Sequence, residues 1–187
     1  MQRGTSSRRV DTALPEGALE HAAQERFDSL YQRYSSPVFR YFLRRLCDPD
    51  RASDATADLF VVVWRRLAAV PDGEREEPWI YAACGNVLRN HRRERRRRQR
   101  LVAKLGSQAQ EPAYTLSEAG ASADLITAIE RLRPADREIL LLSAWEELDH
   151  ATIGRVLGCS THAVDQRIHR AIARLRMEID KSQGSTA

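Results

Sequence analysis

Apolar residues recur at helical spacing along most of the chain, and no stretch alternates with the period of a β-strand. The clearest pattern lies in residues 148–175. A first short apolar face there ends at Gly158, a residue that readily takes the positive φ of a helix C-terminus. Ser160 or Thr161 can cap a second helix through its hydroxyl. The pattern therefore predicts a helix-turn-helix.

The second helix of this motif divides its side chains between two faces. One face is an apolar stripe made of Val164, Ile168, Ala171 and Leu175. The other carries amide, imidazole and guanidinium groups, which suit base edges in a DNA major groove. We expect DNA contacts from the following residues: Ser160, Thr161, His162, Asp165, Gln166, Arg167, His169, Arg170 and Arg174. An ordinary helical hairpin with a solvated face is the alternative.

The same spacing predicts helices in the first half of the chain. One begins at Glu25, with Pro37 marking a break or a fresh start. A second covers residues 52–70. Residues 71–78 are polar and lie between two prolines, which predicts a loop. Trp79 then opens a helix that continues into a run of arginines.

Residues 101–123 are poor in apolar side chains and are predicted to form a flexible linker. Further short helices follow from Asp124 and lead into the helix-turn-helix. We therefore expect an all-α fold of two small helical domains, residues 23–100 and 124–180, with loose tails at residues 1–22 and 181–187.

Positive charge is concentrated in one segment. The chain of 187 residues has a net charge of +4, but residues 89–100 hold eight arginines and one glutamate. This run carries a local charge of +7, so the rest of the chain sums to about −3. Such a run suits phosphate groups, although charge runs also form plain solvated faces. It lacks the interleaved aromatic residues that single-stranded RNA binding favours.

Other features exclude whole classes of protein. The apolar run at residues 59–64 is too short to span a bilayer, and the N-terminal residues do not resemble a signal peptide. Cys47, Cys84 and Cys159 are far apart and form no C-x-x-C motif, so we expect reduced cysteines with no zinc site and no disulfide. We expect a cytoplasmic protein with no stable membrane insertion and no cofactor.

The order of these pieces resembles the extracytoplasmic-function group of bacterial sigma factors, which keep only regions two and four of the sigma family. The resemblance covers roughly residues 25–100 and 124–178. It rests on these motifs: the acidic-aromatic segment Ser53–Trp64 with Phe60 and Trp64, Trp79-Ile80-Tyr81 followed by Asn86, Asn90 and the arginines, Leu132-Arg133-Pro134, Ile139–Leu142, and Arg170–Leu175.

The resemblance implies a non-enzymatic factor that binds core RNA polymerase and promoter DNA and helps to melt the duplex. The helix-turn-helix residues given above would contact the minus-thirty-five element. The minus-ten element would be contacted by Asn86, Arg89, Asn90, Arg92 and Arg93. The loop at residues 71–78, with Glu74, Glu76 and Glu77, would hold a flipped-out base.

The resemblance also implies that the acidic-aromatic helix docks on the polymerase through Asp54, Asp58 and Leu59. An anti-sigma protein is a further expected partner, and the free chain is expected to be a monomer. The chain departs from the family at two places. Ala57-Asp58 replaces a common Gln-Glu in the segment that docks on polymerase, which keeps the acid and loses the amide. Asp165 stands where a basic residue is common, so a different promoter preference is expected.

Alternative interpretations exist for two features of the chain and for its function as a whole. Asp54 and Asp58 share a helix face, but a metal site would need more ligands than two carboxylates, which favours protein docking or plain solvated charge. Trp64 and Trp79 are expected in the core, with a role as stacking platforms as the alternative, and Trp145 is expected in the core as well. A stand-alone helix-turn-helix repressor is the alternative function, and it would need a dimer seam. The sequence shows no sustained heptad pattern for such a seam.

Overall fold

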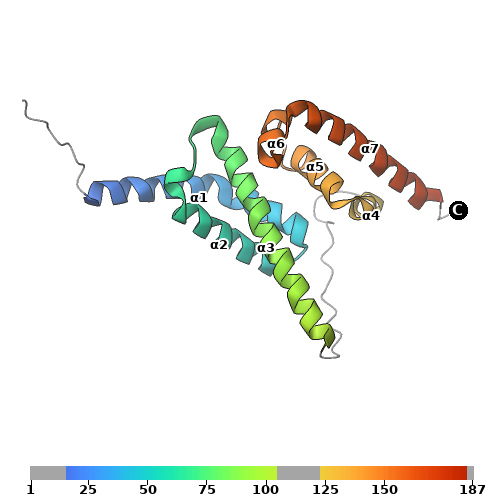
Figure 1. Ribbon diagram of the computed structural model, residues 1–187, viewed down its shortest axis with the longest axis horizontal. Coiled ribbons are helices and arrows are strands. Elements are labelled where there is room, and N and C mark those ends of the chain that lie inside the picture. The colour runs from blue at the N-terminus through green and yellow to red at the C-terminus, as the bar shows by residue number, and fades with distance from the viewer. Residues whose placement is uncertain (1–15, 105–122, 185–187) are drawn as a thin grey trace, which may run out of the picture.

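The computed structural model describes residues 16–104 and 123–184. These ranges contain helices and no strand, so the prediction of an all-α fold is confirmed (Figure 1). The α-helices are α1 (Glu16–Leu46), α2 (Pro49–Arg65), α3 (Glu76–Lys104), α4 (Ala123–Arg131), α5 (Pro134–Ala144), α6 (His150–Leu157) and α7 (Thr161–Gly184). Two short 3₁₀ helices, η1 (Leu67–Ala69) and η2 (Gly73–Arg75), lie between α2 and α3.

The N-terminal domain consists of α1, α2 and α3 packed around an apolar core. Asp48 caps α2 by accepting a hydrogen bond from the backbone N–H of Arg51 at 3.1 Å, and Pro49 suits the first turn because it needs no donor there. The apolar stripes meet in the centre of the domain, where these side chains are fully buried: Val38, Phe42, Leu59, Val63 and Ile80. Burial of these stripes explains why three helices form one unit.

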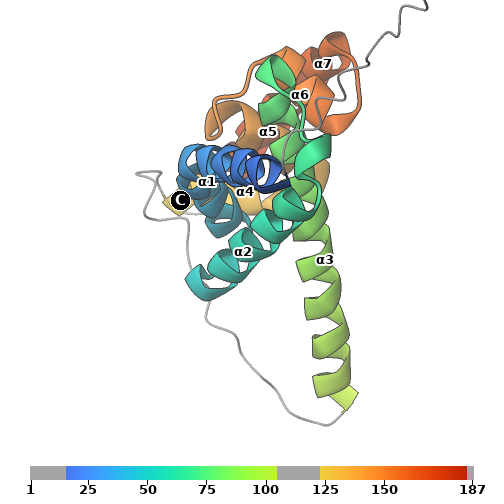
Figure 2. The same cartoon turned by 90° about the vertical axis from the view of Figure 1, so that its left-hand side faces the viewer.

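The C-terminal half of α3 extends beyond this core. Leu88 is buried, whereas every residue from 92 to 101 is exposed. Figures 1 and 2 show the helix projecting away from the body of the molecule in both views. We call residues 92–101 the arginine arm.

The C-terminal domain consists of α4 to α7, with α7 packed against the other three helices (Figure 1). Ile139, Leu142, Ile153 and Val164 are fully buried at its centre. The two domains also touch each other. Their buried apolar residues form one continuous cluster, with α6 lying against α3. The sequence did not predict this contact between domains.

Several predicted boundaries are wrong. Helix α1 begins at Glu16, so residues 16–22 are helical although they were assigned to the N-terminal tail. Pro37 does not interrupt α1, because the turns on either side are held by buried Tyr34, Val38 and Tyr41.

The ends of the other long helices also differ from the expectation. Helix α3 begins at Glu76 rather than Trp79, which makes the last part of the expected loop at residues 71–78 helical. It continues past residue 100 to Lys104, and α7 continues past residue 180 to Gly184. The expected tails and linker at residues 1–15, 105–122 and 185–187 lie outside the described residues.

The tryptophans and cysteines occupy mixed environments. Trp64 is 47 % exposed, so its expected place in the core is wrong, and its ring lies edge-on to Phe27. Trp79 and Trp145 are partly buried. The three cysteines are free thiols, with Cys84 buried and the others half-buried. Within residues 16–104 and 123–184, none of the helices has the length and apolar character that a membrane crossing requires.

Candidate nucleic-acid and polymerase interface

The predicted helix-turn-helix is formed by α6, a tight turn and α7. Asp149 caps α6 by accepting the backbone N–H of Thr152 at 2.6 Å, and this hydrogen bond lowers the pKa of Asp149. Gly158 ends α6 with a φ of 68°, as predicted. A side chain at Gly154 would place its Cβ 2.7 Å from the carbonyl oxygen of Cys159, so only glycine allows the turn to fold this closely.

The start of α7 is capped as the sequence predicted. Ser160 Oγ accepts the backbone N–H of Ala163 at 3.2 Å. Val164, Ile168 and Ala171 face the core, so the apolar stripe is confirmed. The opposite face presents exposed polar side chains at His162, Gln166, Arg167, His169 and Arg170.

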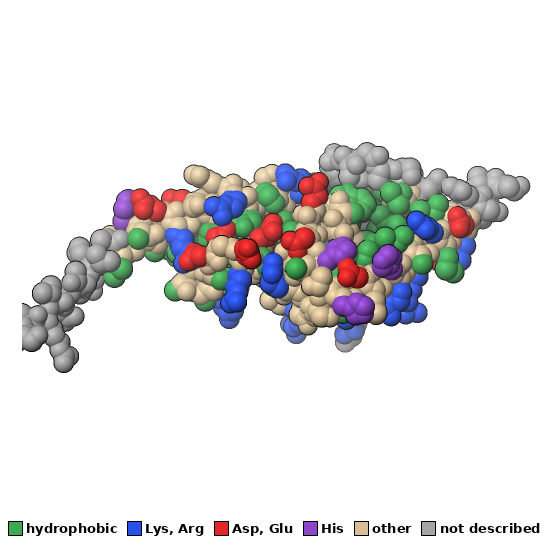
Figure 3. All heavy atoms as spheres, turned by 90° about the horizontal axis from the view of Figure 1, so that it is seen from above, with side chains coloured by type: hydrophobic (Ala, Val, Ile, Leu, Met, Phe, Trp, Pro, Cys, Tyr) green, Lys and Arg blue, Asp and Glu red, His purple; other side chains and the backbone are tan. Residues whose placement is uncertain are grey.

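Two of these exposed side chains are already ordered by their neighbours. Gln166 Nε2 lies 2.9 Å from His162 Nε2, and Arg170 Nε donates to the backbone oxygen of Gln166 at 3.2 Å. Figure 3 shows histidine and basic side chains gathered over the half of the molecule that holds α6 and α7. This face offers donors and acceptors suited to base edges.

Two predicted DNA-contacting residues have partners within the domain. Asp165 is half-exposed and bonds to His150 Nδ1 at the start of α6. Arg174 bonds to Asp136 on α5. Both side chains therefore connect α7 to the helices beneath it, and their expected contacts with DNA stay predictions.

The predicted minus-ten residues lie along the middle of α3. Asn86, Arg89, Asn90 and Arg93 are exposed, and Arg89 donates to the side-chain oxygen of Asn86. Arg92 is also expected to contact the minus-ten element, but its guanidinium is partly desolvated. Desolvation lowers the pKa of Arg92, and the charge of Glu138 in the C-terminal domain opposes this effect. Arg92 therefore lies near the contact between the two domains.

The turn before α3 and the first residue of α3 are held against α1 by ion pairs. Arg26 bonds to Asp72 at 2.8 Å, and Arg33 bonds to Glu76 at 2.6 Å. Tyr34 donates to the same Glu76 carboxylate at 3.0 Å, and burial, followed by this hydrogen bond, raises the pKa of Tyr34 to about 12. The Glu76 carboxylate is thus engaged inside the domain.

Two other acidic residues near the start of α3, Glu74 in η2 and Glu77 in α3, are exposed. Burial raises the pKa of Glu77, and Asp149 on the C-terminal domain adds to the effect. Acidic side chains gather over this part of the molecule in Figure 3. Glu74, Glu76 and Glu77 were expected near a flipped-out base, and of these Glu74 and Glu77 are the ones exposed to a ligand.

The expected polymerase face lies on α2. Asp54 and Asp58 are exposed, and Asp58 Oδ2 also lies 2.8 Å from His91 Nε2 on α3. Leu59 is fully buried in the core, so its side chain supports the helix and is not available to a partner in this conformation.

Two further surface residues on the same helix were not predicted from the sequence. Val61 and Trp64 are each 47 % exposed and continue the surface of Asp58 at helical spacing. The exposed apolar residues of an amphipathic helix are the signal that could have shown them. We call Asp54, Asp58, Val61 and Trp64 the α2 face. Within the described residues, no group of three or more His, Cys, Asp or Glu side chains is arranged to hold a metal ion.

Comparison with known proteins identifies the two domains. The Sigma-70 region 2 family matches residues 30–98, and the Sigma-70, region 4 family matches residues 122–175. The RNA polymerase sigma factor NccH of Alcaligenes xylosoxydans xylosoxydans is 28 % identical, over 93 % of this chain and 97 % of NccH. The ECF RNA polymerase sigma factor SigE of Mycolicibacterium smegmatis is also 28 % identical, over 94 % of this chain and 70 % of SigE.

Solved structures have the same fold. The sigma factor RpoE of Bartonella quintana, in complex with the anti-sigma factor NepR, aligns with a TM-score of 0.64 at 17 % identity, covering 82 % of this chain and 96 % of RpoE. CnrH, in complex with the cytosolic domain of CnrY, aligns with a TM-score of 0.59 at 23 % identity, covering 87 % of this chain and 94 % of CnrH.

The two helical domains thus define a promoter-specificity factor of bacterial RNA polymerase. The chain belongs to the sigma factors of the extracytoplasmic-function group, with region two in α1–α3 and region four in α4–α7. Its partners are core RNA polymerase and promoter DNA. These matches favour the sigma assignment over a stand-alone repressor.

Proposed function

We propose that α7 contacts the minus-thirty-five element and α3 the minus-ten element. On α7, His162, Gln166, His169 and Arg170 would contact base edges, because they are exposed opposite the buried stripe. Ser160, Thr161 and Arg167 would contact phosphates at the start and flank of the helix, because they are exposed there. Asp165 and Arg174 hold the helix in position through His150 and Asp136.

The exposed face of α3 is proposed to bind the strand that separates during melting. Asn86, Arg89, Asn90 and Arg93 would contact this strand, and the arginine arm would bind phosphates beside it. Glu74 and Glu77 can accept hydrogen bonds from base amino groups while their charge repels the DNA backbone. The ion pairs that hold this loop to α1 would fix the position of the flipped base.

The α2 face is proposed as the polymerase contact. It combines two carboxylates with an apolar valine and a half-exposed tryptophan ring, a combination typical of protein interfaces. Replacing Trp64 with alanine should lower the affinity for core polymerase by at least tenfold, since buried aromatic anchors dominate such interfaces. Asp50→Ala, at the other end of α2, is the matched control and should leave the affinity unchanged.

The exposed α7 face is the observation that carries this proposal, and footprinting tests it. The isolated protein should bind promoter duplex weakly, because one small module makes a limited interface. With core polymerase it should protect two separate elements and open the nearer one. A sharp palindromic footprint from the protein alone at physiological salt would contradict the proposal and favour a dimeric repressor.

The chain is proposed to act as a monomer in the cytoplasm, where polymerase and DNA are found, and without catalysis of its own. An anti-sigma protein is a proposed regulator, since RpoE was solved in complex with the anti-sigma factor NepR. A pull-down from the native cell should recover either core polymerase or such an inhibitor, rarely both together. Recovery of neither would contradict regulation by sequestration.

A further inference from the structure

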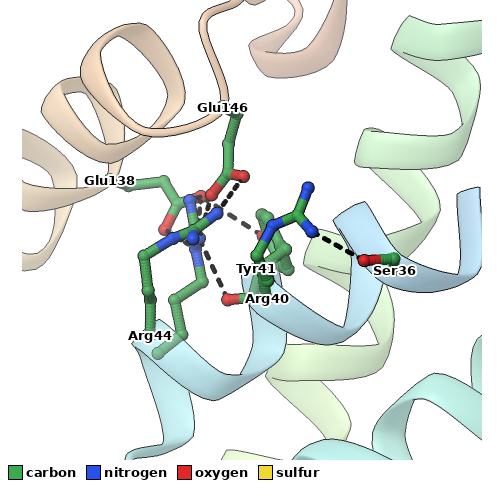
Figure 4. A network of polar contacts seen from close by, with 7 residues as sticks. Ser36, Arg40, Tyr41, Arg44, Glu138 and Glu146 are labelled. Atoms are coloured by element: carbon green, nitrogen blue, oxygen red, sulfur yellow. Dashed lines mark hydrogen bonds and ion pairs between the residues drawn. The ribbon is translucent and has the colours of Figure 1, made fainter. Parts of the chain in front are cut away.

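Polar side chains make ordered contacts in two different settings in this structure. Between the domains, Arg44 bonds to Glu146 and Arg45 bonds to Glu138 at 3.0 Å, so opposite charges neutralise each other (Figure 4). On the exposed face of α7, the contacts involve groups that can also bond to a base edge. The second setting bears on which base the chain recognises.

His162, Gln166 and Arg170 form an exposed row along α7, because residues four apart lie on the same side of a helix. Gln166 Nε2 lies 2.9 Å from His162 Nε2. Arg170 Nε donates to the backbone oxygen of Gln166 at 3.2 Å. The row therefore holds Gln166 through both its side-chain nitrogen and its backbone.

The contact between Gln166 and His162 has only one possible direction. An amide nitrogen carries two N–H groups and accepts no hydrogen bond, so it donates to the imidazole ring. His162 Nε2 is then the acceptor nitrogen, and the neutral ring carries its proton on Nδ1. His162 thereby determines which end of the Gln166 amide faces the ring.

The amide oxygen and the second N–H of Gln166 are not used by this bond and remain for a partner. In the major groove, adenine presents an acceptor at N7 and a donor at its amino group, and a glutamine amide matches both at once. Guanine presents two acceptors instead, so it cannot satisfy the amide oxygen. The bond to His162 should become stronger when α7 enters the groove and water is excluded.

We propose that Gln166 recognises an adenine in the minus-thirty-five element and that His162 is a positioning residue for this contact. The inference rests on the function proposed above and adds the identity of one base. The positioning role is additional to the base contact proposed for His162. When the ring gains a proton, Nε2 becomes a donor and the amide oxygen turns toward it. The amide N–H groups then face the DNA, and the preference for adenine over guanine falls.

Imidazole changes charge between about pH 5 and 8, so recognition at this base should depend on pH. Other titratable and charged groups belong to the helices and the turn packed around the start of α7. They are Asp149, His150, Arg155, Cys159, Asp165, Arg167, His169, Arg170, and the pair Asp136–Arg174. Protonation of His150 or His169 changes the attraction to phosphates. Reversal of the Gln166 amide instead changes the ratio of adenine to guanine at one position.

Selection from a DNA library tests the base assignment. The chain, assembled on core polymerase, selects duplexes that are randomised over the minus-thirty-five element, at about pH 8 and about pH 6. At the higher pH the wild type should enrich adenine at one position by about tenfold or more, and Gln166→Ala should abolish enrichment at that position. At the lower pH the wild type should lose part of this enrichment in favour of guanine.

Two substitutions of His162 distinguish positioning from a merely structural role. His162→Asn keeps an acceptor four residues before Gln166 but does not titrate, so adenine enrichment should persist at both pH values. His162→Leu removes the acceptor and should lower the enrichment by about two- to tenfold at both. His21→Asn is the matched control, because this exposed histidine on α1 also has a partner four residues on, Glu25. It should behave as the wild type, and circular dichroism establishes that each variant keeps its helices.

Nitrogen NMR of the imidazole rings in the free chain tests the contact without DNA. The Glu25 carboxylate only accepts, so the neutral His21 ring should carry its proton on Nε2. The His162 ring should carry its proton on Nδ1 to a greater extent, and Gln166→Ala should remove this difference. Equal proton placement in the two rings of the wild type would overturn the positioning role.

The library result separates this inference from the proposed function. A preference for another base at the position that depends on Gln166, or adenine enrichment unaffected by pH and by His162→Leu, would overturn the inference alone. Selection of no sequence over the minus-thirty-five element would contradict the proposed function and the adenine contact together, while the NMR result would still establish whether His162 orients Gln166.

Discussion

The carboxylate of Asp165 on α7 bonds to Nδ1 of His150 at the start of α6. This pair connects the two helices of the helix-turn-helix on a surface that is a little under half exposed. The carboxylate therefore connects α7 to α6 in the structure, and the contact with a base expected from its place in the recognition helix stays a prediction.

Replacing Asp165 with asparagine should have a small and uniform effect. A half-exposed ion pair contributes about 0–1 kcal/mol to stability, so the thermal midpoint should fall only slightly. Affinity for matched and altered minus-thirty-five sequences should change by the same factor. The measurement is a binding titration against both sequences, and a loss confined to one base pair would show that Asp165 contacts that base instead.

Replacing Gln166 or Arg170 with alanine should reduce discrimination between bases. Removing a bidentate or single side-chain bond to a base edge costs about 1–3 kcal/mol at that position. Arg167→Ala is the control, because its side chain lies on the flank and contacts Cys159 Sγ. It should weaken binding evenly. Equal losses on matched and scrambled elements for all three variants would refute the assignment of base-contacting residues.

The arginine arm should contribute to DNA binding in a salt-dependent and sequence-independent manner. Replacing Arg96, Arg97 and Arg98 with glutamine should reduce the slope of log K against log salt by about 0.9 for each phosphate that is no longer bound. Arg40→Gln, at an exposed position on α1, should leave the slope unchanged. The measurement is promoter binding by the polymerase complex over a range of salt, and an unaltered slope in the triple variant would exclude phosphate binding by these arginines.

Stability should fall at alkaline pH partly through Tyr34. Its pKa is raised from the ordinary value of 10.0 to about 12, so the folded state retains the proton longer than the unfolded state. The stabilising contribution is complete below about pH 10 and is lost as the pH rises to about 12. Tyr34→Phe should flatten this part of the curve in urea titrations.

Tyr31→Phe is the matched control for this experiment, because the Tyr31 ring is 50 % exposed. It should follow the wild type throughout the alkaline range. Identical curves for the wild type and Tyr34→Phe would contradict the raised pKa of Tyr34.

The sequence predicted correctly those features of the fold that depend on local pattern. It failed where contacts between residues far apart in the chain determine helix continuity or burial. The stripe containing Val164 and Ile168 and the turn at Gly158 follow from helical spacing and backbone conformation, and both are correct. Pro37 was expected to interrupt a helix, but buried neighbours hold α1 continuous. Trp64 matched an apolar stripe yet lies at the surface, because Phe60 and Val63 fill the core positions beside it.

A single sequence contains no pattern that predicts ion pairs between residues far apart in the chain. Arg45 and Glu138 are separated by 93 positions, and each fits an exposed face of its own helix when considered alone. Asp58 was expected to contact polymerase, while its bond to His91 joins two helices whose relative orientation the sequence does not specify. The position of Arg92 beside region four was not predicted for the same reason, because the sequence does not specify how the two domains are oriented.

Run-off transcription with purified core polymerase is the decisive measurement for the function of this chain. The template should carry a promoter taken from the native genome, and the matched variant is Arg170→Ala. We predict that core polymerase alone gives no specific transcript, that the wild-type chain gives a transcript with a defined start, and that the variant gives markedly less from the same promoter. Absence of any chain-dependent transcript with core polymerase of the native organism would contradict promoter-specific initiation by this chain.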